Sequence, residues 1–182
     1  ESKAFLEHLG FSGNMPEEGS EEKPKWSFQI NDELISQFTT AKRAYDKAAK
    51  KQNWIRIPEL EAARKNNDAK IEDILTNAKT EAAKTRAQQK VLPYNEANAK
   101  IDAELTPLKE SRDALQSALV MAAQAVEQQQ QQYQAALNDA EGVKTAAKKL
   151  GISIDPLAKK QQSAWQPAIE FLAEGKLASL GL

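Results

Sequence analysis

The chain has 182 residues, with 25 basic and 26 acidic side chains and a formal net charge of −1. It has no cysteine and one histidine, so it can form neither a disulfide nor a cluster of histidine metal ligands. The balanced charge gives no reason to expect a specific nucleic-acid binder. We therefore expect no metal and no cofactor, and a function that depends on shape.

Charged residues make up 28 % of the sequence, and much of its apolar fraction is alanine. This composition, low in glycine, is typical of long helices. The aromatic residues are concentrated near the two chain ends, and only Tyr94 and Tyr133 lie in the long stretch between Trp54 and Trp165. Because thick cores need large side chains, we expect a thin stalk and a bulkier head.

The first 30 residues are mixed in character. Residues 2–9 can form a short helix, and residues 10–22 combine glycines with an acidic cluster, which is typical of a loop. Trp26, Phe28 and Ile30 then alternate with polar residues, as in a strand. We interpret this segment as an extended arm that packs its aromatic side chains on a helix.

Two helices are expected next. Asn31 or Asp32 can cap the first, which runs to about Asn53 with one apolar stripe. Residues 54–57 interrupt the pattern, and Pro58 suits the first turn of a second helix that continues to about Val91.

The sequence Leu92-Pro93-Tyr94-Asn95 predicts the end of that helix and a tight reversal. A further helix is expected over about 95–150, kinked but not broken at Pro107. Its apolar positions alternate steps of four and three: Ile101, Leu105, Leu108, Arg112, Leu115, Leu119, Ala122 and Val126. This is a coiled-coil seam with one charged position.

Gly151 is expected to end that helix. Asp155 and Pro156 then open a last helical segment, kinked or split at Pro167, and an apolar tail occupies 177–182.

A reversal centred on Pro93 predicts which residues face each other across the hairpin. Trp54 would lie opposite Tyr133, and Arg112 would reach Asp73 to fix the register, since a buried charge needs a partner.

The predicted fold is all-α: a long, coiled-coil-like antiparallel helical hairpin with a smaller helical head from both chain ends. The alternative is a compact three-helix bundle. The expected divisions are an arm with an acidic linker over 1–30, the hairpin over 31–150 with its tip near 91–97, and a C-terminal segment over 151–182.

No motif indicates catalysis. His8 has no orienting partner nearby in the sequence, and no phosphate-binding glycine loop occurs. The cations around Tyr45 end a helix that begins with acids, which complements the helix dipole. The five glutamines 128–132 are interpreted as solvated helix surface with one polar seam position. We therefore expect no enzymatic activity.

The favoured function is a structural or interaction module that uses an elongated rod to span a distance and present a tip or a head. Secreted bacterial toxins, secretion-system tip or translocator proteins and virion components use rods of similar architecture. The expected contact residues are Leu92, Pro93, Tyr94 and Asn95 at the tip, and Trp26 and Trp165 on the head.

The expected partner is another protein or a second copy of the chain, and a membrane surface is less favoured. The alternative function is a membrane-active protein that rearranges to insert 114–126 or the apolar tail. A start without methionine suggests a processed or excised form, and a secreted location is slightly favoured.

Overall fold

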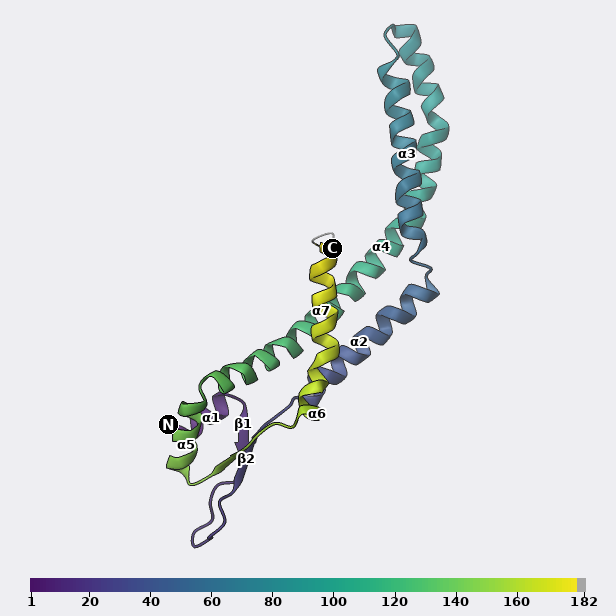
Figure 1. Ribbon diagram of the computed structural model, residues 1–182. Helices are drawn as coiled ribbons and strands as arrows, with labels where there is room; N and C mark the ends of the chain where they lie inside the picture. Colours follow the sequence, from purple (N-terminus) through teal and green to yellow (C-terminus); the bar gives the residue numbers. More distant parts are fainter. Residues whose placement is uncertain (180–182) are drawn as a thin grey trace. The chain divides into compact units, whose positions relative to one another are not determined.

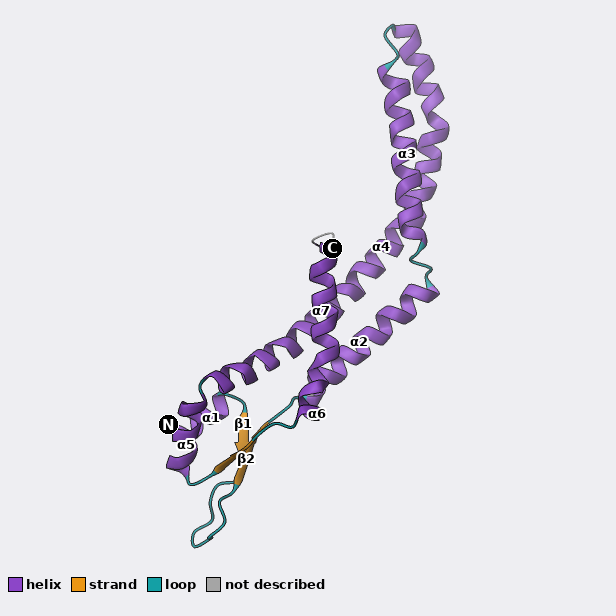
Figure 2. Ribbon diagram, viewed as in Figure 1, coloured by secondary structure: helices purple, strands orange, loops and turns teal. Residues whose placement is uncertain are grey.

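A computed structural model describes residues 1–179 (Figure 1). The chain is all-α in class, and the described residues include one small sheet of three strands (Figure 2). The chain divides into two compact units. We call Glu1–Ala41 with Ala118–Leu182 the head unit, and Lys42–Ser117 the hairpin unit. The predicted apolar tail, 177–182, extends beyond the described residues.

A long antiparallel helical hairpin and a head built from both chain ends were predicted, and this fold class is confirmed. Two helices contribute residues to both units, α2 (Asp32–Lys51) and α4 (Glu81–Asn138). The predicted hairpin range, 31–150, is thus divided, because residues 31–41 and 118–150 belong to the head unit.

In the hairpin unit, α3 (Arg56–Thr76) runs antiparallel to the first part of α4 (Figure 1). The two helices are joined by residues 77–80. Asn77 ends α3, and the Thr80 hydroxyl accepts a hydrogen bond from Ala83 N (3.2 Å) at the start of α4. These residues satisfy backbone groups that the helix ends leave unpaired.

The reversal predicted near 91–97 is corrected to 77–80, because α4 continues through Pro93 and Pro107. Both prolines are exposed, so the carbonyl groups that lose a helical partner can turn toward water. The buried face is not interrupted: Ala87, Val91 and Asn98 are 4–6 % exposed. Packing along this face offsets the local cost of the prolines.

Trp54, Ile57, Leu60 and Leu105 form the apolar cluster of the hairpin unit. Tyr45 of α2 packs edge-on against Trp54, with ring centroids 5.1 Å apart. Residues 42–51 therefore cover the base of the hairpin, where Leu108 and Leu115 of α4 also pack. Because α2 and α3 contact successive stretches of α4, this unit is not the compact three-helix bundle that was the alternative.

A polar network crosses the seam farther along the hairpin. Asn98 is 6 % exposed; its amide donates to Asp68 Oδ1 (3.1 Å), and its carbonyl accepts from Asn67 Nδ2 (3.0 Å). Arg64 Nε donates to Asp102 Oδ1 (2.8 Å) and a second guanidinium nitrogen contacts Asp68. The hydrogen bond to Asp102 raises the pKa of Arg64. A buried asparagine in a helix seam specifies register.

That network has the role that was predicted for Arg112 and Asp73. Arg112 instead pairs with its neighbour Asp113 (3.0 Å), and Asp73 accepts from Asn77 Nδ2 (3.1 Å). The predicted pairing of Trp54 with Tyr133 is also corrected, because Trp54 packs in the hairpin unit and Tyr133 in the head unit. Both predictions depended on a reversal at Pro93.

The head unit begins with α1 (Ser2–His8), β1 (Phe11–Gly13) and β2 (Lys25–Phe28). Its later part contains the end of α4, α5 (Ala140–Leu150), β3 (Ser153–Asp155), α6 (Lys159–Gln162), a 3-10 turn η1 (Ser163–Trp165) and α7 (Gln166–Ser179). The arm predicted over 26–30 therefore includes part of β2, the central strand of a sheet in the order β1-β2-β3, while Ile30 lies beyond the strand.

Aromatic side chains from both chain ends meet in the core of the head unit. Phe28 lies edge-on to Phe11, Tyr133 and Trp165, with ring centroids 5.0–6.0 Å apart. Trp26 and Trp165 are 1 % and 2 % exposed. The predicted aromatic head is present, but both tryptophans are buried in it: β2 places Trp26 on the same face as Phe28, and Trp165 packs against Phe28.

The side chain of Gln129 on α4 ties three segments of the head unit together. Its carbonyl accepts from Asn31 N (3.0 Å) and from Trp165 Nε1 (3.1 Å), and its amide donates to the Gln29 carbonyl (3.2 Å). Gln132 donates to the His8 carbonyl (2.9 Å). Part of the glutamine run is thus structural rather than solvated surface.

No helix within residues 1–179 is long and apolar enough to cross a membrane. In the segment that the alternative function would insert, Leu119, Ala123 and Val126 are 0–1 % exposed.

We predict that Gln129→Ala lowers the free energy of unfolding by about 2 kcal/mol, because it leaves the buried Trp165 indole N–H without an acceptor. Gln131→Ala is the matched control: Gln131 is exposed, and its loss should change stability by less than about 0.5 kcal/mol. Urea unfolding followed by tryptophan fluorescence measures both. Equal stability of the two variants would contradict this role of Gln129.

We predict that Asn98→Ala destabilises the hairpin unit by about 1–3 kcal/mol, because the half-buried amide of Asn67 loses its acceptor and the bond from Asn98 to Asp68 is also lost. The exposed Gln89 on the same helix offers the control, Gln89→Ala, with almost no expected effect. Urea unfolding followed by circular dichroism at 222 nm checks this. An unchanged midpoint for Asn98→Ala would mean that the network does not stabilise the hairpin.

Candidate binding site

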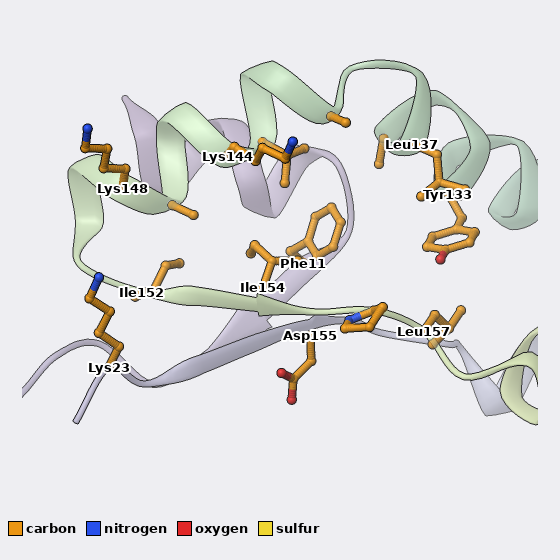
Figure 3. A pocket seen from close by; sticks show the side chains of 15 residues that line it. Phe11, Lys23, Tyr133, Leu137, Lys144, Lys148, Ile152, Ile154, Asp155 and Leu157 are labelled. Carbon is orange, nitrogen blue, oxygen red and sulfur yellow. The ribbon is translucent and has the colours of Figure 1, made fainter.

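The head unit contains an apolar pocket of about 430 Å³ between the end of α4, α5 and β3 (Figure 3). This volume is within the range of small-ligand and side-chain pockets. The apolar lining comes from separate segments: Phe11, Tyr133, Ala136, Leu137, Ala140, Val143, Ala147, Ile152, Ile154, Pro156 and Leu157.

The local sequence explains why α5 leans over β3. α4 ends at Asn138, and Asp139 adopts a non-helical conformation while its carboxylate accepts from Gly142 N (3.2 Å). A Cβ atom on Gly142 would come within 2.6 Å of that carboxylate, so a larger residue here would require the Asp139 side chain to shift. At the other end of α5, Gly151 takes a left-handed conformation (φ 69°) and leads directly into β3.

The walls of the pocket are held in place by the core. Phe11, Val143, Ile152 and Leu157 are each 4–7 % exposed although they line the pocket. Leu137 is 50 % exposed and lies at the opening. Buried walls together with exposed apolar side chains such as Leu137 suit the insertion of an apolar group.

Lysine side chains set the charge around this apolar interior. Lys23, Lys144 and Lys148 all line the pocket and are exposed. Lys144 pairs with Glu141 (3.2 Å), whereas Lys23 and Lys148 have no ion-pair partner among residues 1–179. The carboxylate of Asp155 points away from the pocket (Figure 3) and lies 4.0 Å from Lys25. The opening therefore favours an acidic ligand.

The structure does not bring the predicted contact residues together. Trp26 and Trp165 are buried in the head core. Leu92, Pro93 and Asn95 are exposed on α4, while Tyr94 is half-buried beneath Lys70, whose ammonium lies 5.7 Å from the ring centroid. These four residues lie in mid-helix, and the actual turn of the hairpin is at 77–80. Of the predicted seam residues, Tyr133 lines the pocket.

Sequence reasoning did not find this pocket. Two signals were available: Ile152 and Ile154 alternate with polar residues between Gly151 and Pro156, and Val143 and Ala147 share one face of a short helix. Neither signal shows that these segments meet. Within residues 1–179, no group of three or more acidic or histidine side chains could hold a metal ion.

Comparisons of the chain with protein-family models, with curated proteins and with solved structures gave no match.

We predict that the anionic, apolar dye 8-anilinonaphthalene-1-sulfonate binds this pocket with enhanced fluorescence. Lys148→Glu should weaken binding about fivefold, or about 1 kcal/mol, because it reverses a charge at the opening. The exposed Lys160 does not line the pocket, so Lys160→Glu, with the same change in net charge, is the control. Equal affinity of the two variants would place the dye elsewhere.

Proposed function

We propose that this chain is a non-enzymatic interaction module whose head unit binds a partner protein through the pocket. The pocket carries the proposal because it joins a rigid apolar interior to an opening with exposed lysines. An apolar cavity with a few polar groups at its edge is the usual form of a binding site.

The proposal also gives the hairpin unit a role, as a spacer that adds length to the module. Its large exposed apolar side chains, Ile55, Leu75 and Leu92, are separated along the chain, and single exposed apolar residues need no partner. α3 alone, with 21 residues, extends about 30 Å at 1.5 Å per residue. In this proposal the hairpin gives the module length, and the tip contact at Leu92–Asn95 is replaced by the pocket.

The membrane-active alternative has less support. Two of the apolar side chains that it would insert, Leu119 and Val126, are fully buried in the head unit, whereas Met121 of the same segment is 70 % exposed. Exposing them requires loss of the packing that holds the unit together, at a cost of about 1.5–3 kcal/mol for each large side chain.

The experiment is a selection from a random 12-residue peptide library on the full chain. Ala147→Trp fills the pocket, and Leu137→Asp makes its opening polar and acidic without changing a buried residue. We expect enriched peptides to bind the unaltered chain and to lose at least tenfold in affinity for either variant. Ala173→Trp, at an exposed position on α7, should leave binding unchanged.

Circular dichroism and urea unfolding of each variant show that it is folded before its affinity is interpreted. Recovery of no peptide whose binding depends on Ala147 or Leu137 would overturn the proposed function.

A further inference from the structure

One side of the pocket is bordered by the open edge of the sheet. Among the described residues, β3 pairs with β2 alone, in parallel, with Ser153 opposite Lys25 and Asp155 opposite Ser27. Ser153 N donates to the Pro24 carbonyl (3.0 Å). In a parallel ladder with this register, Ser153 and Asp155 direct their backbone groups toward β2, and Ile154 directs its N–H and C=O away from it.

The side chains of β3 alternate in the expected way. Figure 3 shows Ile152 and Ile154 pointing toward α5, on the pocket side, and Asp155 pointing to the other side. All three residues of the strand are half-buried, and Ile154, Asp155 and Pro156 line the pocket. The unpaired backbone groups of Ile154 therefore lie beside the pocket.

An unpaired strand edge is a template for an added strand, and a neighbouring pocket can then select one of its side chains. The template here is short. Pro156 has no N–H, and the Leu157 carbonyl already accepts from Gln162 Nε2 (2.8 Å). An added segment can thus pair with Ile154 and with few other groups, so the inserted side chain and the lysines must supply much of the affinity.

The charge of the opening indicates the composition of that segment. Lys23 and Lys148 lie exposed beside the pocket without an ion-pair partner in the described part of the chain. A basic segment would be repelled there, and an acidic one attracted.

We propose that the pocket takes an extended, acidic segment of a partner protein. The segment adds to the sheet next to β3 through the backbone of Ile154. It inserts one large apolar side chain between α5 and β3, and places acidic residues near Lys23 and Lys148. This inference rests on the proposed function and specifies its partner.

The test uses the peptides recovered by the selection described above. We expect them to share one large apolar residue flanked by Asp or Glu. In a scan of single N-methylated positions, the position that donates to Ile154 should lose about tenfold in affinity, since one backbone hydrogen bond is lost, and its immediate neighbours should lose little.

Variants of the chain test the same contact from the other side. Ile154→Ala keeps the backbone N–H and shortens the side chain, whereas Ile154→Pro also removes the N–H that faces the open edge. We expect Ile154→Pro to bind at least tenfold more weakly than Ile154→Ala. Lys148→Glu should reduce affinity about fivefold, and Lys160→Glu should not.

The outcomes separate the two proposals. Pocket-dependent peptides without acidic residues would overturn the acidic composition of the segment, and full tolerance of every N-methyl group would overturn the added strand. Either result would leave the proposed function standing. Pocket-dependent binding of dodecanoate, with no peptide recovered, would overturn both. The N-methyl scan uses the unaltered chain, so it decides the matter even if Ile154→Pro does not fold.

Discussion

The head unit depends on one meeting point, where Gln129 and Tyr133 of α4 hold the two chain ends. Gln129 accepts from Trp165 Nε1 and from Asn31 N and donates to the Gln29 carbonyl. One helical turn later, Tyr133 packs against Phe28 and Trp165 at 5.0 and 5.6 Å. A single amide thus satisfies polar groups beside an aromatic core, where an unpaired donor would be costly. The position of β2, and through it of β3 and the pocket, follows from this anchoring.

The head was foreseeable because its signal is compositional. Bulky side chains near both ends of the sequence, with few between them, predict that the ends pack together, and Phe28 and Trp165 do so. The start of α2 and the end of α5 were also predictable. Asn31 caps α2 with its side-chain oxygen, and Gly151 ends α5 in a left-handed conformation.

The hairpin turn was misplaced because a local rule was given more weight than a periodic one. Pro93 disfavours a helix by itself, yet the four-and-three steps of the seam extend from Leu105 back through Asn98 to Ala87, and each of these positions is buried or half-buried. A proline on the solvent face does not disturb such a seam. The turn at 77–80 lacks glycine and proline and relies on Thr80 as a cap, which is a weaker signal.

The pocket was beyond sequence reasoning for a different reason. Its strands have three or four residues each, too few for a periodic pattern to stand out, and its walls join segments more than 100 residues apart. The same shortness has a physical consequence. Within β3, which comprises Ser153–Asp155 between Gly151 and Pro156, Ile154 is the residue whose backbone faces outward. An edge this short resists uncontrolled strand addition, so binding there must be selected by the side chains around it: an apolar interior and the lysines at its opening.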